Sequence, residues 1–295
     1  MKKAIRLTTT FTIFMLLFSC TTTKEVDDKS KQEKIKDGPG KIYWKDGSLR
    51  GEGNFKNFLK TGNWILYHKA TGEKQAEGKF QNDKQEGKWI YFHKSGPKSM
   101  LGIFKGGQKN GEWKAFYKNG KLLWKAKYVL QKIQGMDIGG IQGTKISYFK
   151  NGKVWKEEEY RKGVKRGRSQ EYYENGKPKE ISWFKDGKYH GKTNRWWPNG
   201  KLSEQGFYSN DRRIGEWKFF HNNGNKKMTG KFVNGKMSGK WNVYSIEGWL
   251  ESNGQFKGGK QVGIWSFYNN KRHLTKKLTL NGGMISGKCW IYENK

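Results

Sequence analysis

Three of the five histidines occupy one equivalent position in a repeating sequence, and a set of imidazoles could bind a transition metal. They are His68, His93 and His221. If each repeat adds two strands to a sheet, equivalent side chains lie about 10 Å apart. A zinc ion holds its nitrogen ligands at only about 2 Å, so histidines at this spacing do not share one. The sequence therefore predicts no metal site, and it indicates no cofactor.

A run of three glutamates is the second candidate for chemistry, because paired carboxylates perform general acid–base catalysis. Glu157, Glu158 and Glu159 are consecutive, and consecutive strand residues point to opposite faces. We therefore interpret them as solvated strand residues that offset nearby lysines. The chain has no Ser-His-Asp signature, phosphate-binding glycine loop or HExxH motif. We expect a protein that is not an enzyme, and an envelope hydrolase is the least favoured interpretation.

The element that must position these residues is an internal repeat. A glycine recurs every 24 residues, at Gly143, Gly167, Gly191, Gly215, Gly239, Gly263 and Gly287. Periods of about 20 to 50 residues indicate repeat architectures, in which one unit buries its apolar surface only against its neighbours.

Two columns of large apolar residues run through the repeats. The first is aromatic throughout: Tyr43, Tyr67, Phe92, Phe116, Tyr148, Tyr172, Trp196, Phe220, Tyr244, Tyr268 and Tyr292. The second is Phe55, Phe80, Phe104, Tyr128, Tyr160, Phe184, Tyr208, Phe232, Phe256 and Leu280. The spacing is longer by one residue in HKATGEK and by eight in VLQKIQGMDIGGIQG. We expect the eight extra residues to form a loop insertion within residues 129–143.

The glycines divide each unit into two short segments, which predicts a β-hairpin. KNG, ENG, PNG and NNG place Asn-Gly where a tight turn needs positive φ, whereas KDGKYHG and VNGKMSG indicate a looser turn. Strands of about six residues rich in Tyr, Phe and Trp fit between such turns, and glycine every dozen residues would interrupt a helix. The predicted fold is all-β: an elongated single antiparallel sheet or solenoid of about ten hairpins over residues 40–295.

An incomplete tryptophan column precedes the first aromatic column by three residues, at Trp64, Trp89, Trp113, Trp217, Trp241 and Trp265. Because three is odd, regular strands would place the two columns on opposite faces. Either a bulge rotates the tryptophans or both faces carry aromatic residues. Lys145, Ser169 and Thr193 stand in this column in the middle repeats, where we expect looser packing. Cys289 stands in it in the last repeat, and we expect a small buried apolar residue there.

The combined pattern GKW-x-x-Y-x-x-x-G and G-x-F-x-x-G-K-x-x-G resembles the MORN-repeat variant of bacterial proteins that are often grouped as the YwqK antitoxin family. The resemblance covers about residues 40–295, as ten hairpins and a final strand, CWIYENK. It implies an elongated antiparallel sheet that is used as a scaffold or for binding, and it implies no catalytic residues.

The N-terminus resembles the signal of a bacterial lipoprotein. A basic start, MKKAIR, precedes the run FTIFMLLF, which is too short to be a stable membrane-spanning helix. LFSC then resembles a lipobox, with Cys20 as the lipid attachment site. A soluble secreted protein cleaved near the same place, or a chance apolar start, are the alternatives. We expect a signal peptide at 1–19, a lipidated flexible tether at 20–39, and export to a lipid-anchored place on the bacterial cell membrane or outer membrane.

Charge indicates the kind of partner. The net charge is +34; the first 39 residues contribute +3, so the repeats carry +31. Such a field favours anionic lipid head groups, acidic polysaccharides or an acidic protein partner. Specific nucleic acid binding is not expected, because export separates the protein from it and no motif for it occurs. Four lysines of the looser turns, Lys165, Lys188, Lys236 and Lys260, are expected to line one edge and bind an anionic surface together.

The favoured function is thus a non-enzymatic lipoprotein scaffold of the cell envelope that binds proteins or anionic surfaces. The alternative is an antitoxin-like module that neutralises another protein, which a neighbouring toxin gene would favour. The sequence leaves the ligand, the membrane and the oligomeric state open.

Replacing the expected lipid attachment site tests the anchor. We predict that Cys20→Ala releases the protein from the membrane fraction and leaves its signal uncleaved by the lipoprotein peptidase, because no thiol remains to be acylated. Fractionation and labelling with a radioactive fatty acid measure this. Unchanged fractionation and unchanged labelling would contradict the anchor.

Overall fold

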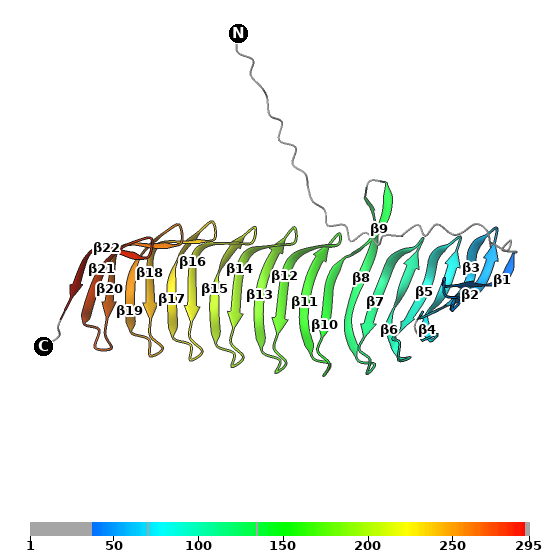
Figure 1. Ribbon diagram of the computed structural model, residues 1–295, viewed down its shortest axis with the longest axis horizontal. Coiled ribbons are helices and arrows are strands. Elements are labelled where there is room, and N and C mark those ends of the chain that lie inside the picture. The colour runs from blue at the N-terminus through cyan, green and yellow to red at the C-terminus, as the bar shows by residue number, and fades with distance from the viewer. Residues whose placement is uncertain (1–36, 70, 134, 293–295) are drawn as a thin grey trace, which may run out of the picture. The chain divides into compact units, whose positions relative to one another are not determined.

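The computed structural model describes residues 37–292 with the exception of residues 70 and 134. This part of the chain forms 22 strands in one antiparallel sheet, with successive hairpins side by side (Figure 1). The strands are β1 (Gly38–Tyr43), β2 (Leu49–Lys56), β3 (Leu59–Tyr67), β4 (Lys74–Gln81), β5 (Lys84–Phe92), β6 (Lys98–Lys105), β7 (Gln108–Phe116), β8 (Leu122–Ile133), β9 (Met136–Ile141), β10 (Gly143–Tyr148), β11 (Val154–Arg161), β12 (Val164–Tyr172), β13 (Pro178–Lys185), β14 (Lys188–Trp196), β15 (Leu202–Ser209), β16 (Arg212–Phe220), β17 (Lys226–Val233), β18 (Lys236–Tyr244), β19 (Leu250–Lys257), β20 (Lys260–Tyr268), β21 (Leu274–Asn281) and β22 (Met284–Ile291). None of the described residues belongs to a helix that could span a membrane.

Ten hairpins follow the repeat, and β22 is the final strand of the described sheet, which confirms the predicted all-β repeat fold. Each strand pairs with its neighbours in the chain, as β16 does with β15 and β17. Each hairpin is therefore held by the hairpins before and after it, so the sheet can carry equivalent side chains in long columns.

The repeating glycine lies inside a strand. The sequence predicted it in the looser turn, and that prediction is wrong. Gly239 belongs to β18 and has a φ of 68°. On β17 the pairing passes from Lys231 opposite Ser238 to Gly230 opposite Trp241, so two residues of β18 lack a partner there. Positive φ favours glycine at such a bulge. Because pairing continues past the bulge, most strands have eight or nine residues and not about six.

The two turns of each repeat are the reverse of the expected ones. In VNGK, both Asn234 (φ 50°) and Gly235 (φ 80°) have positive φ, which makes this two-residue turn the tight one, of type I′. In YKNGK, only Gly120 has positive φ (80°), and the Asn119 side chain accepts a hydrogen bond from the backbone N–H of Lys121 at 3.1 Å. Asparagine in the KNG-type turn therefore acts through its side chain and does not adopt the left-handed conformation.

The expected loop within residues 129–143 is instead a β-hairpin. β8 is extended, and β9 folds back on it with Tyr128 opposite Ile141. β10 then pairs with β8, so the main sheet continues past the insertion. A Cβ at Gly139 would lie 2.1 Å from the carbonyl oxygen of Lys109. The glycines that indicated a loop therefore permit a close approach of the inserted hairpin to β7.

One face of the sheet, here named the Trp face, carries the tryptophan column and the second apolar column. Its tryptophans, Trp64, Trp89, Trp113, Trp217, Trp241 and Trp265, are at most 2% exposed. Trp241 packs edge-to-face with Phe232 and Phe256, at centroid distances of 5.2 and 5.9 Å. The first aromatic column lies on the opposite face, where the Tyr67 hydroxyl donates to Glu52 at 2.6 Å. Both faces therefore carry aromatic residues, which resolves the alternative left open by the sequence.

Glycines on the neighbouring strands make room for the indole rings. Trp241 lies opposite Gly230 on β17 and Gly254 on β19. A Cβ at Gly230 would lie 2.2 Å from the indole, closer than atoms can approach. The tryptophan and the glycine on the preceding strand thus form one unit, in which the ring fills the space that the absent side chain of the glycine leaves. Trp265 covers Gly254 in the same way.

In the middle repeats both members of this unit change together. Ser169 lies opposite Glu158, and Thr193 lies opposite Ser182. Thr193 and Ser182 are both fully buried, at 0% exposed. The expected looser packing is therefore not seen at this pair, because the side chain opposite Thr193 is larger than glycine.

Cys289 is exposed, which corrects the expected buried position. Among the described strands β22 pairs only with β21, and Cys289 lies opposite Leu278. A residue of the tryptophan column is enclosed by strands on both sides, and Cys289 has such a neighbour on one side only.

A double-mutant cycle tests the tryptophan–glycine unit. We predict that Gly230→Ser lowers the free energy of unfolding by about 1–3 kcal/mol through overpacking, and that Trp241→Thr lowers it by about 3–5 kcal/mol through loss of the buried ring. In the double variant the loss of unfolding free energy should be smaller than the sum of the two single losses. The threonine that replaces Trp241 leaves room for the serine that replaces Gly230, as Thr193 does for Ser182. Urea denaturation measures this, with exposed Lys231→Ser as the control. Additive losses would contradict the unit.

Candidate functional site

Four consecutive repeats present a cation at the same edge of the sheet, just after the type I′ turn. Lys188, Arg212, Lys236 and Lys260 are the first residues of β14, β16, β18 and β20, and we call this set the basic edge. All four side chains are exposed, and none forms an ion pair within the described part of the chain. One strand lies between each of these strands and the next, so two inter-strand spacings place the cations about 10 Å apart.

Other cations add to the basic edge. Lys185 pairs across its turn with Lys188, and Lys257 pairs across its turn with Lys260. Like charges held side by side repel each other, so the pairs cost stability in the absence of a counter-ion. An anion at the edge would relieve this repulsion, and the arrangement is therefore suited to bind one.

Of the four lysines proposed from the sequence, the structure brings together three and separates Lys165. Lys165 is the second residue of β12, and the edge position of that repeat is occupied by Val164. The Lys165 ammonium lies 2.8 Å from the Glu158 carboxylate and 3.5 Å from the centroid of the Phe184 ring. The sequence reasoning missed Arg212, although its spacing of 24 residues from Lys188 was sufficient to find it.

Ion pairs replace aromatic packing in the middle of the Trp face, across β11 to β16; we call this the central ion cluster. In its first half, Glu158 contacts Lys165 at 2.8 Å and Lys156 at 3.6 Å. Glu171 contacts Lys156 at 3.5 Å and Lys179 at 2.7 Å. Every carboxylate of this half has two cationic neighbours, so it is held as an acceptor and is not free to act as a base.

The second half of the central ion cluster is built on arginines. Arg195 bridges Glu180, at 2.7 Å, and Glu204. Arg213 contacts Glu204 at 3.0 Å, and its guanidinium lies 4.5 Å from the centroid of the Trp217 ring. The cluster therefore passes directly into the aromatic packing of the following repeats.

The cations of the cluster keep its buried carboxylates ionised. Burial alone would raise the pKa of the Glu158 carboxyl, but the hydrogen bond from Lys165 and the charges of Lys165 and Lys156 lower that pKa below its ordinary value. Burial likewise opposes ionisation of Glu180, and Arg195 with Ser182 lowers the pKa of Glu180 below the ordinary value. Burial, followed by the charge of Glu180, raises the pKa of Tyr189 to about 12.

The acidic run alternates between the two faces as predicted. Glu158 joins the central ion cluster, while on the other face Glu159 accepts the backbone N–H of Arg168 at 2.9 Å and Glu157 accepts the Tyr172 hydroxyl at 3.4 Å. The side chain of Glu158 is only 13% exposed, so the expectation of a solvated residue is wrong at that position.

The three histidines bind the backbone of the next repeat. The Nε2 atoms of His68, His93 and His221 lie 3.3, 3.0 and 3.0 Å from the carbonyl oxygens of Phe92, Phe116 and Tyr244. A carbonyl only accepts, so Nε2 carries the proton in each bond. At the same position Tyr117, Tyr173 and Trp197 donate to equivalent carbonyls at 2.7, 2.7 and 3.3 Å. The described residues contain no group of His, Cys, Asp and Glu side chains arranged to hold a metal ion.

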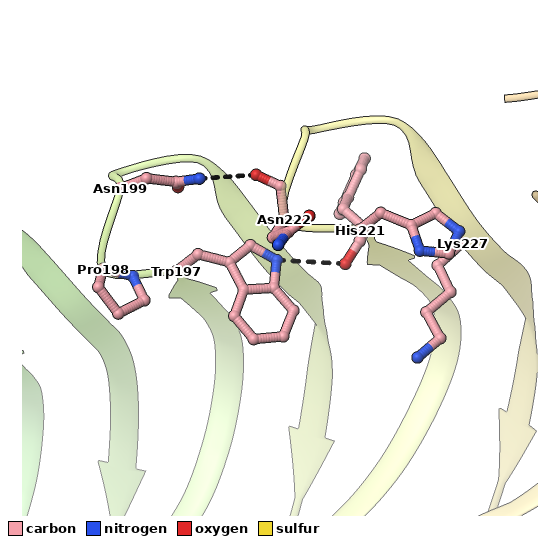
Figure 2. Close-up of a pocket in the computed structure, with 7 residues that line it drawn as sticks. Trp197, Pro198, Asn199, His221, Asn222 and Lys227 are labelled. Atoms are coloured by element: carbon pink, nitrogen blue, oxygen red, sulfur yellow. Dashed lines mark hydrogen bonds between the residues drawn. The ribbon is translucent and has the colours of Figure 1, made fainter. Parts of the chain in front are cut away.

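A shallow hollow lies between two neighbouring three-residue turns, on the edge opposite the basic edge (Figure 2). It is lined by Trp197, Pro198, Asn199, Phe220, His221, Asn222 and Lys227. The Asn199 side-chain amide donates to the carbonyl oxygen of Asn222 at 2.7 Å, and this bond ties the two turns together. Neither motif nor spacing indicated this hollow, because its lining comes from the ends of two strands and from two turns.

The comparisons with known proteins bear on the repeat. Segments 36–57, 109–129, 141–162, 165–188, 189–210 and 213–234 match the family model described as MORN repeat variant. Six segments of the chain are therefore similar to MORN-variant repeats. Of the four residues of the basic edge, the matched segments include only Lys188. No curated protein matches the sequence.

Solved structures resemble the chain only distantly. A crystal structure of TcdB2-TccC3-TEV is 12% identical, with a TM-score of 0.18, over 83% of this chain and 15% of that chain. A Photorhabdus luminescens Tc holotoxin pore is 10% identical, with a TM-score of 0.17, over 86% of this chain and 17% of that chain. The chain thus corresponds to less than a fifth of the length of these structures. Cys20 and the expected signal lie outside the described residues.

Acid should weaken the central ion cluster. A carboxyl with a lowered pKa in the folded state contributes stability that is complete above its unfolded pKa and is lost as the pH falls through its folded pKa. For Glu158 and Glu180 the loss begins below about pH 4.3, the ordinary glutamate value. Between pH 7 and pH 3 the measured free energy of unfolding should fall less steeply in the double variant Glu158→Gln, Glu180→Gln than in the wild type. Exposed Glu216→Gln is the control, and an unchanged slope in the double variant would refute the assignment.

Proposed function

We propose that the MORN-variant repeats form a non-catalytic scaffold of the cell envelope whose basic edge binds the phosphate groups of an anionic lipid surface. The observation that carries the proposal is a row of four exposed cations that have no ion-pair partner among the described residues: Lys188, Arg212, Lys236 and Lys260. In this proposal Cys20 carries the lipid that tethers the chain to the same membrane. One acyl chain binds only weakly, so further acyl chains or a basic surface are needed for firm attachment.

The geometry of a hairpin sheet supports edge-on contact with a plane. Equivalent turns of consecutive hairpins lie along one edge, so their cations approach a flat surface together. Each cation near an anionic membrane contributes about 1 kcal/mol, so four together are sufficient for detectable binding. The side chains of the two-residue turns before these cations are short or absent: Asp186-Gly187, Asn210-Asp211, Asn234-Gly235 and Gly258-Gly259. Two of these residues are carboxylates, and neither forms an ion pair within the described residues, so the cations stay accessible.

A protein-neutralising role, which the antitoxin grouping implies, would place an acidic protein at the same edge. The two roles differ in what they require of the surface. Lipid binding depends on the charge density of the membrane, whereas a protein partner requires a defined match to the spacing of the cations. Binding to protein-free vesicles therefore distinguishes them.

Charge reversal at the basic edge tests the proposal. We predict that changing Lys188, Arg212, Lys236 and Lys260 to Glu reduces co-sedimentation of the full chain with vesicles that contain anionic phospholipid to the level seen with neutral vesicles, because the edge then repels the phosphates. Wild-type binding should weaken steeply between 0.01 and 0.1 M salt, where the Debye length falls from about 30 to about 10 Å. Neutral vesicles should bind only through the lipid anchor.

The matched control makes the same charge change on the opposite edge. Lys118, Lys121, Lys150 and Lys153 are exposed residues of the three-residue turns, and their change to Glu should weaken binding far less. Equal loss in both variants would show that only net charge matters and would contradict the basic edge. Equal binding of the wild type to neutral and anionic vesicles at both salt concentrations would contradict lipid binding by the repeats.

A further inference from the structure

We propose that the hollow between the turns at residues 197–199 and 221–222 binds an acidic sugar residue of a glycan, with the sugar ring on Trp197 and its carboxylate at Lys227. The hollow and the basic edge lie at opposite ends of the strands. This inference therefore does not rest on membrane binding by the repeats.

The hollow has a fixed apolar floor. The Trp197 side chain is 37% exposed, and its Nε1–H donates to the carbonyl oxygen of Phe220 at 3.3 Å. Pro198 lies beside the indole in Figure 2, on the side away from Lys227. An aromatic surface that is already held in place loses little conformational freedom on binding. Such a surface suits the flat face of C–H groups that a pyranose ring presents.

The rim of the hollow provides unused polar groups. Lys227 and Asn222 are exposed, and neither the Lys227 ammonium nor the Asn222 amide has a partner within the described residues. His221 and Asn199 are already engaged, since His221 Nε2 contacts the carbonyl of Tyr244 and Asn199 donates to that of Asn222. The engaged groups fix the positions of the two turns, and the Lys227 ammonium and the Asn222 amide are available to a ligand. A cation and an amide can bind a carboxylate and a hydroxyl respectively.

The equivalent positions in the neighbouring repeats lack this combination. One repeat earlier, Tyr173 and Glu174 stand in place of Trp197 and Pro198, and Ser203 stands in place of Lys227. One repeat later, the position of Lys227 is taken by Glu251. An apolar floor beside a free cation therefore occurs at this place and not at the two adjacent ones. The difference favours a specific ligand over a general property of the repeat.

The combination indicates a sugar acid more than the other anions of an envelope. A lipid phosphate would use Lys227 but leave the indole without a role. A neutral sugar would use the indole but leave the cation without one. An aliphatic side chain of a peptide requires an enclosed pocket, and this hollow is open to solvent. A sugar ring with a carboxylate uses the floor, the amide and the ammonium together.

Calorimetric titration of the full chain with trigalacturonate, and with galactotriose as the neutral analogue, tests the inference. Wild type should bind trigalacturonate more tightly than galactotriose. Trp197→Ala should weaken trigalacturonate binding by about tenfold or more, as for the loss of a central aromatic anchor. Lys227→Met should remove the preference for the acidic sugar, at a cost of up to about fivefold for one exposed ion pair, and should leave the binding of galactotriose unchanged.

Two controls separate this site from the rest of the molecule. Tyr173→Ala, at the equivalent position one repeat earlier, should leave trigalacturonate binding unchanged. The variant with the basic edge changed to Glu should still require Trp197 for binding, which keeps this result distinct from the outcome for lipid. Unchanged affinity in Lys227→Met, which exposes no new apolar core, would overturn the inference. Binding of hexaglutamate with equal affinity and equal dependence on Trp197 would also overturn it, since an acidic peptide would then be the ligand.

Discussion

The packing of each indole ring over a glycine of the preceding strand is the constraint on which the sheet depends. A single layer of strands has no second layer to cover its apolar face, so each repeat must bury its large side chains between its own neighbours. Trp241 achieves this by lying over Gly230, between Phe232 and Phe256, and Trp265 lies over Gly254 in the same way. The same arrangement explains why the tryptophan and its glycine are replaced together in the middle repeats, where Thr193 lies opposite Ser182. Register is fixed as a result, because a slip by one residue would place a side chain where the ring must lie.

This way of burying side chains leaves the two turn edges free to vary. The type I′ turns carry the basic edge, and the three-residue turns carry the side-chain ladder of His68, Tyr117, Trp197 and their equivalents. Each member of the ladder binds the backbone of the next repeat, so identity at that position can change among His, Tyr and Trp while the bond is kept. At one place the change to Trp197, with Pro198 beside it and Lys227 nearby, also makes a hollow. Local differences on a uniform scaffold are the usual source of specificity in repeat proteins.

The 24-residue period was sufficient to predict the hairpins, their number and the two aromatic columns, because spacing alone determines which residues become equivalent. It did not determine where the turns lie. Gly239 and its equivalents mark bulges inside strands, and both bulges and turns use positive φ, so sequence does not distinguish them. The misplacement of Lys165 has the same origin: it precedes Gly167 by two residues, whereas Lys188 precedes Gly191 by three. The central ion cluster and the hollow depend on pairings between strands, and those are visible only in the folded sheet.

The central claim is that the sheet uses one turn edge to meet an anionic surface. Amide hydrogen exchange of the full chain, followed by mass spectrometry with and without anionic vesicles, tests it most directly. The account predicts slower exchange in the four turns at residues 185–188, 209–212, 233–236 and 257–260, with no change in the three-residue turns at the opposite edge. Protection of the opposite edge or of the Trp face, or no protection in the four turns while the chain is bound, would contradict it.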